Sequence, residues 1–124
     1  MRIFLHVFLA LLILNGCSLF GSEDNTNSRE LSRVISKNGH EAYIVETSLE
    51  DNIENTQVIL QFAGGKCGAG AVSSPNTNLG LKISWVDGNT LKVLKPSGVS
   101  LKRNASGETI QCLEQKVNVI IENN

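Results

Sequence analysis

Few side chains in this sequence of 124 residues belong to the types that carry out catalysis. Only two histidines are present, and His6 lies in an apolar N-terminal stretch, so His40 is the one candidate for acid–base chemistry. A histidine can activate a nucleophile or a water molecule when a carboxylate orients its ring. One hypothesis is therefore a small hydrolase that uses His40 with an acid from residues 41–54. The other interpretation places His40 in a solvent-exposed turn, without a catalytic role.

Metal and nucleotide chemistry have little support in the residue spacing. Two cysteines 45 residues apart and one histidine do not match a zinc site. Glu50, Asp51 and Glu54 lack the alternating pattern of a calcium loop. Residues 64–71 contain Gly-Lys after a predicted strand, but Cys67 stands where a phosphate-binding loop needs Ser or Thr. We therefore expect no metal and no cofactor.

The N-terminal segment has the layout of a secretory signal peptide. Arg2 is followed by the apolar residues 3–14 and then by Leu14-Asn15-Gly16-Cys17. A small residue followed directly by cysteine resembles the lipobox of bacterial lipoproteins. The resemblance implies that residues 1–16 are removed, that Cys17 carries lipid, and that Ser18 directs the protein to the outer membrane. The apolar run is shorter than the roughly twenty residues that span a bilayer. A transmembrane helix and an ordinary leader with an incidental Cys17 are the alternatives.

The resemblance also implies a location and a domain organisation. Two or more acyl chains hold a protein stably at a membrane, so we expect an anchor in the bacterial cell envelope. The protein then faces the periplasm from the outer membrane, with the cell surface as the alternative. Residues 17–30 form the lipidated N-terminus and a flexible tether, because residues 22–28 are polar throughout. Residues 31–124 form a single β domain. By size and class the chain resembles small β-rich lipoproteins.

Two cysteines remain once Cys17 is assigned to lipid. An even number of cysteines in an oxidising compartment predicts a disulfide between Cys67 and Cys112. Such a bond closes a loop of about 46 residues and stabilises the fold by roughly 4 kcal/mol, if it acts through chain entropy. Two free thiols and an intermolecular disulfide are the alternatives.

The apolar residues alternate with polar ones, which predicts an all-β fold. We expect a small antiparallel sheet, a meander or a sandwich of about six to eight strands. The alternating runs lie near residues 42–47, 58–62, 81–86, 90–95, 99–102, 110–112 and 117–121. Asp87-Gly88-Asn89 predicts a hairpin, and the chain from Gly80 onward predicts a meander of about five strands. A single helical turn is possible near residues 30–35.

A faint internal repeat accompanies this pattern. Residues 38–45 align with residues 87–94 at a spacing of 49, each as a turn followed by a strand. A coincidence between two generic β-hairpins explains the likeness equally well.

The best candidate for a binding surface is the long segment 64–80. Its glycines and turn residues predict a loop that Cys67 pins in place, and loops carry much of protein function. Lysines at positions 82, 92 and 102 alternate away from apolar neighbours, so they are expected to share one basic face. Solubility and edge protection are the alternative role for these lysines. The candidate residues are Lys66, Gly68, Gly70, Asn76, Asn78, Lys82, Lys92 and Lys102.

The overall charge limits the possible partners. Residues 17–124 contain ten basic and twelve acidic residues, a net charge of −2, which argues against nucleic acid. The leading hypothesis is a non-catalytic, outer-membrane-anchored module that binds an envelope protein or polymer, as an inhibitor, immunity factor or assembly accessory. The alternative is the small envelope hydrolase that uses His40.

Overall fold

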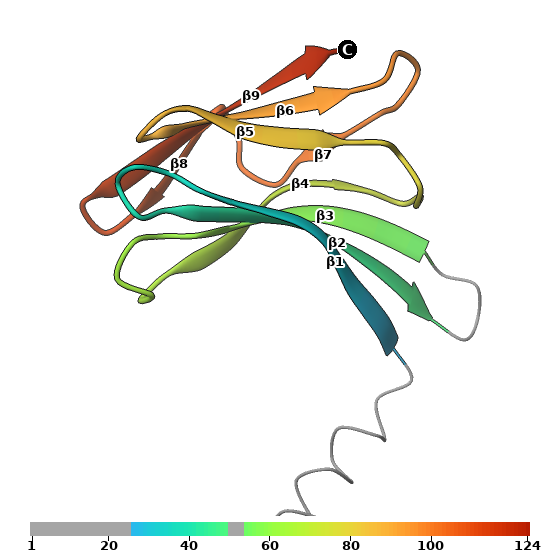
Figure 1. Ribbon diagram of the computed structural model, residues 1–124, viewed down its shortest axis with the longest axis horizontal. Coiled ribbons are helices and arrows are strands. Elements are labelled where there is room, and N and C mark those ends of the chain that lie inside the picture. The colour runs from blue at the N-terminus through green and yellow to red at the C-terminus, as the bar shows by residue number, and fades with distance from the viewer. Residues whose placement is uncertain (1–25, 50–53) are drawn as a thin grey trace, which may run out of the picture.

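The computed structural model describes residues 26–49 and 54–124 as a β-sandwich, whereas the predicted leader and residues 17–25 of the predicted tether, Cys17 included, lie outside these ranges. The nine described strands are β1 (Thr26–Ile35), β2 (Glu41–Leu49), β3 (Glu54–Gln61), β4 (Gly68–Ser74), β5 (Lys82–Asp87), β6 (Thr90–Lys95), β7 (Lys102–Arg103), β8 (Thr109–Cys112) and β9 (Gln115–Asn123). They form a first sheet in the order β1-β2-β3-β4-β7 and a second sheet in the order β5-β6-β9-β8 (Figure 1). The predicted all-β fold is confirmed. No helix in the described ranges is long and apolar enough to span a membrane.

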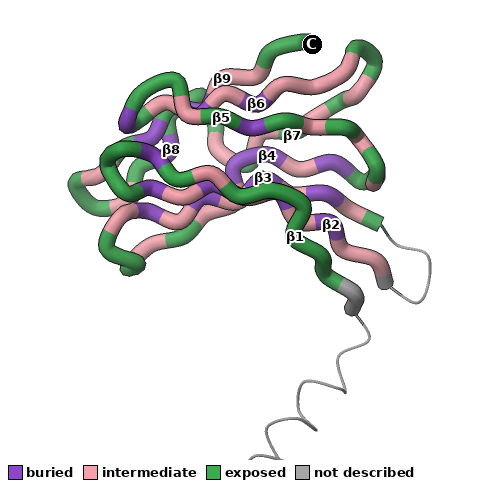
Figure 2. The backbone as a smooth tube through the Cα atoms, viewed as in Figure 1, coloured by how far each residue is buried: buried purple, intermediate pink, exposed green. Residues whose placement is uncertain are grey.

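The core lies between the two sheets, where the alternating apolar side chains of both meet. In β3 of the first sheet every second residue from Thr56 on is buried, and in β6 of the second sheet Leu91 and Val93 are fully buried (Figure 2). The outward-facing residues of these strands remain partly accessible to solvent. The buried apolar residues are Ala42, Ile44, Val58, Leu60, Phe62, Ala71, Val72, Ile83, Leu91, Val93, Ile110, Val117 and Val119.

The predicted meander after Gly80 is wrong. Two separate hairpins form there, β5–β6, as Asp87-Gly88-Asn89 predicts, and β8–β9. β7 crosses to pair with β4 in the first sheet, and β9 lies between β6 and β8. The pairing of β6 with β9 is parallel, from Thr90 opposite Asn118 to Lys95 opposite Asn123. Alternation indicates which side of a strand is buried but not which strand lies beside it.

Two strands occur where the sequence predicted none. β1 begins at Thr26, so the end of the predicted tether and the possible helical turn near residues 30–35 are both strand. Within the segment predicted as a loop, residues 68–74 form β4, which pairs with β3 and β7. β1 is an edge strand with a register shift between Glu30 and Ser32, and its described residues 28–33 are exposed. An edge strand that is exposed to solvent tolerates polar side chains at consecutive positions, so its sequence lacks the alternation of apolar and polar residues that marks a strand. Conversely, the strand predicted at residues 99–102 is reduced to β7.

The sandwich has two distinct ends along its strand direction. Four turns gather at one end, namely residues 36–40, 62–67, 88–89 and 113–114, and we call this group the clamped end (Figure 1). β1 begins at the opposite end and reaches the clamped end at Ile35. Ten residues of strand at about 3.3 Å each separate the two ends by roughly 30 Å.

Candidate functional site

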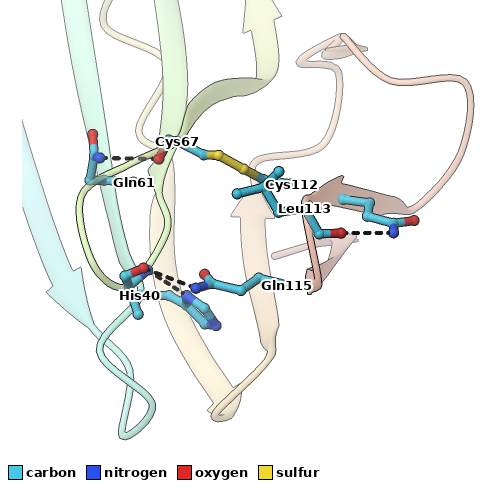
Figure 3. The surroundings of a disulfide bond; sticks show 8 residues. His40, Gln61, Cys67, Cys112, Leu113 and Gln115 are labelled. Carbon is cyan, nitrogen blue, oxygen red and sulfur yellow. Dashed lines mark hydrogen bonds between the residues drawn. A yellow bond between two sulfur atoms is a disulfide. The ribbon is translucent and has the colours of Figure 1, made fainter.

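A disulfide links the two sheets at the clamped end. Cys67 ends the turn between β3 and β4, and Cys112 ends β8, with 6.3 Å between their Cα atoms (Figure 3). The predicted disulfide is therefore confirmed. Side-chain amides support it on both sides: Gln61 donates to the carbonyl oxygen of Cys67, and Gln115 donates to that of Ala63, each at 3.0 Å. The first sheet and the second sheet are thus joined covalently and by hydrogen bonds.

His40 is buried inside this end rather than exposed on a turn, so the exposed-turn interpretation is wrong. Its side chain is wedged between aromatic rings, edge-on to Phe62 at 5.6 Å and tilted against Trp85 at 6.1 Å between centroids. Nδ1 accepts the backbone N–H of Ala63 at 3.0 Å, which leaves Nε2 to carry the proton and donate to Asn89 Oδ1 at 3.3 Å. Both ring nitrogens are therefore used in holding turns together.

The described acids of the segment 41–54 lie away from the His40 ring, and Glu50 and Asp51 lie outside the described residues. Glu41, next to His40 in sequence, forms an ion pair with Arg33 at 2.8 Å. Glu46 points away to the opposite end of the sandwich, where it pairs with Arg29. No described carboxylate hydrogen-bonds to the His40 ring, and the described residues include no cluster of potential metal ligands.

The two turns that the faint repeat aligns lie side by side. Asn38 Nδ2 donates to Asn89 Oδ1 at 2.9 Å, so this oxygen accepts hydrogen bonds from both Asn38 and His40. A Cβ atom on Gly88 would collide with the Asn38 side chain, so only glycine allows this close approach. The corresponding turns of the two sheets are therefore packed directly against each other.

A hollow opens beside the disulfide on the outside of the clamped end. Its volume is about 470 Å³, and it is lined by Lys66, Leu113, Glu114 and Gln115. Leu113 is 74% exposed, more than any other large apolar side chain in the described ranges. The hollow thus combines one apolar side chain with one charge of each sign.

A second, polar pocket lies at the opposite end, near the start of β1. Its volume is about 320 Å³, and it is lined by Arg29, Glu46, Ser48, Glu54, Thr77 and Asn78. The Glu46 side chain is only 7% exposed; it accepts the backbone N–H of Asn78 at 2.6 Å and Arg29 Nη2 at 2.7 Å. The Asn78 hydrogen bond, followed by the Arg29 contact, lowers the pKa of Glu46. Through its hydrogen bond from Asn78, this carboxylate holds the β4–β5 connection onto β2.

We expect Glu46→Gln to lower the free energy of unfolding by about 1–2 kcal/mol at pH 7, because a charge-assisted hydrogen bond becomes neutral. A carboxyl whose pKa is lowered by folding stabilises the fold above its unfolded pKa, near 4.5. That contribution is lost as the pH falls through the lowered pKa. Urea unfolding at a series of pH values should therefore show the two proteins converging below pH 4.5. Glu108→Gln, on the exposed surface, serves as the control. A difference in the free energy of unfolding between the wild-type protein and Glu46→Gln that persists unchanged at acid pH would contradict the stabilising role of the ionised Glu46.

The structure separates the binding residues predicted from the sequence. Only Lys66 lies in the clamped end. Gly68, Gly70 and Lys102 lie on the outer side of the first sheet, and Asn104 lies over Gly70. Asn76 and Asn78 lie in the β4–β5 connection; the Asn76 carbonyl oxygen accepts from Thr56, and the Asn78 N–H donates to Glu46. Lys82 and Lys92 lie on the outer side of the second sheet.

The expected single basic face is therefore wrong. Lys102 belongs to the first sheet, whereas Lys82 and Lys92 belong to the second, and the outer sides of a sandwich face away from each other. Sequence reasoning also missed Leu113, Asn89 and Gln115. The one signal for Leu113 is its place in a two-residue turn between strands, where Gly or Asn is usual.

Comparisons of this chain with protein-family models, with curated proteins and with solved structures find no match.

Proposed function

We propose that this chain is a lipid-anchored protein of the bacterial outer membrane whose β-sandwich is a non-catalytic binding module for an envelope protein or polymer. The anchor is the lipid expected on Cys17, and the recognition surface is the clamped end. Inhibition, immunity and assembly are the roles that such a module can serve.

The observation that carries this proposal is the position of the clamped end. A chain anchored through Cys17 enters the sandwich at Thr26, at the end where β1 begins. The four turns and the Cys67–Cys112 disulfide lie at the other end. An anchor at one end and a cross-linked set of turns at the other suit a module that reaches a partner away from the membrane. Rigid turns also lose little conformational entropy on binding.

The environment of His40 supports a non-catalytic module over the small hydrolase. A general base needs a free ring nitrogen within reach of the proton that it removes. Nδ1 of His40 already accepts from Ala63, and Nε2 faces Asn89. The ring therefore contributes to the packing of the turns.

Site-specific photocrosslinking in intact bacterial cells tests the proposal. A photoreactive amino acid replaces Lys66 at the clamped end, or Lys82 or Lys102 on the outer sides of the two sheets, in the full chain with Cys17 intact. All three lysines are exposed, which matches them for access to a partner. We expect one envelope component to attach through position 66 and not through positions 82 and 102.

The Cys17→Ser form then separates recognition from membrane placement. A partner that the clamped end recognises should also be retained by this form when it is mixed with detergent-solubilised envelope. Attachment only through position 82 or 102 would move the binding surface to a sheet face. Attachment through none of the three positions would contradict the binding function itself.

A further inference from the structure

Leu113 has an unusual conformation for its residue type. It occupies the first position of the two-residue turn between β8 and β9, with a φ angle of +56°. Glycine and asparagine adopt this left-handed region readily, whereas leucine rarely does. Its side chain is 74% exposed, so packing within the described domain does not offset the strained backbone. A strained, exposed apolar residue points to a function outside the fold.

The turn that carries Leu113 is held rigidly. Cys112, the preceding residue, is bonded to Cys67, and Gln111 Nε2 donates to the carbonyl oxygen of Leu113 at 3.0 Å (Figure 3). On the other side of the turn, Gln115 donates to the carbonyl oxygen of Ala63. The leucine side chain is therefore presented from a fixed backbone, which reduces the conformational entropy lost on binding.

The surroundings of Leu113 indicate the kind of partner. The hollow beside it is lined by Lys66 and Glu114, one charge of each sign. A glycan presents hydroxyl groups and does not provide an apolar socket for a leucine. With the lipid proposed on Cys17, the chain comes from the membrane into the other end of β1, roughly 30 Å from Leu113. A single leucine with one lysine is also a weak membrane anchor. A protein with an apolar socket matches the position and the chemistry best.

We propose that Leu113 is the anchor residue by which the clamped end inserts into an apolar socket on a protein partner. An acidic group on the rim of that socket faces Lys66, and a basic group faces Glu114. This inference rests on the proposed binding function and narrows its partner class to a protein. The strained turn is retained because its side chain is needed in the complex, a trade of stability for function.

The test combines stability and affinity measurements on the full chain in detergent. Leu113→Asn relieves the backbone strain, so we expect its melting temperature to rise by about 3 °C. The partner attached through position 66 is purified and titrated against the wild-type protein, Leu113→Asn and a matched control, Leu31→Asn. Leu31 is also an exposed leucine, at 47%, but lies in β1. We expect Leu113→Asn to weaken binding at least 30-fold, and Leu31→Asn to stay within twofold.

Several results would overturn the anchor role. Equal affinity of Leu113→Asn and the wild-type protein for the partner would do so while leaving the binding function intact. A melting temperature of Leu113→Asn below that of the wild-type protein would contradict the backbone strain at this position. Dimerisation of the purified chain that Leu113→Asn abolishes, measured by sedimentation, would assign the socket to a second copy. Leu113-dependent binding to vesicles of phosphatidylethanolamine and phosphatidylglycerol would assign it to lipid. Absence of any attached component overturns both proposals.

Discussion

Replacing Cys67 and Cys112 with serine is expected to lower the free energy of unfolding by about 4 kcal/mol. The bond closes a loop with a sequence separation of 45 residues, and it ties β8 of the second sheet to the β3–β4 turn of the first. Without the bond the unfolded chain gains conformational entropy, which favours unfolding. For a domain of this size the melting temperature should fall by about 15 °C or more, measured by circular dichroism.

The single variants Cys67→Ser and Cys112→Ser provide the control, because each removes the same bond. Both should lie within about 1 kcal/mol of the double variant. Loss of the disulfide should also loosen the turn that carries Leu113. The yield of photocrosslinking through position 66 should therefore fall even below the melting temperature. A double variant as stable as the wild-type protein would show that hydrogen bonds alone hold the two sheets together.

Replacing His40 with alanine is expected to cost about 3 kcal/mol. The change leaves the Ala63 N–H without its acceptor and opens a cavity beside Phe62 and Trp85. Urea unfolding of the full chain in detergent measures this loss. The prediction follows from a structural role of the ring, because a solvent-exposed histidine could be removed at little cost.

His40→Asn distinguishes the structural role from the hydrolase hypothesis. The asparagine side-chain oxygen can occupy the place of Nδ1 and still accept from Ala63, so about half of the lost stability should return. A folded His40→Asn protein should bind its partner through the clamped end as the wild-type protein does. Loss of biological function in this variant, with stability and partner binding retained, would instead support catalysis by His40.

Alternation in the sequence predicted the buried strands well. β3 and β6 are buried on one side and solvated on the other, and this produces a clear period of two. β1 gives no such signal, because its exposed residues face solvent along an edge of the first sheet. β4 was missed because Gly68 and Gly70 resemble loop residues, although both lie within the strand.

The candidate site could be predicted only where covalent chemistry defines it. The pairing of Cys67 with Cys112 was predicted because two cysteines remain once Cys17 is assigned to lipid, and the structure confirms the pair. The grouping of the lysines failed because the path of the chain between the sheets decides which outer side a residue joins; Lys102 lies in the first sheet for this reason. Leu113 looks like a core residue beside a strand, and only the turn geometry exposes it.

The parallel pairing of β6 with β9 has a consequence for the order of folding. Thr90 pairs with Asn118, so 28 residues must be made and arranged before this ladder can close. β9 also occupies an interior place between β6 and β8, whereas β5 and β6 are adjacent in sequence and close locally. Contacts between distant segments form slowly. Because synthesis runs from the N-terminus, the second sheet must therefore stay incomplete until β9 is available, and during that interval β6 exposes an unpaired edge to other chains.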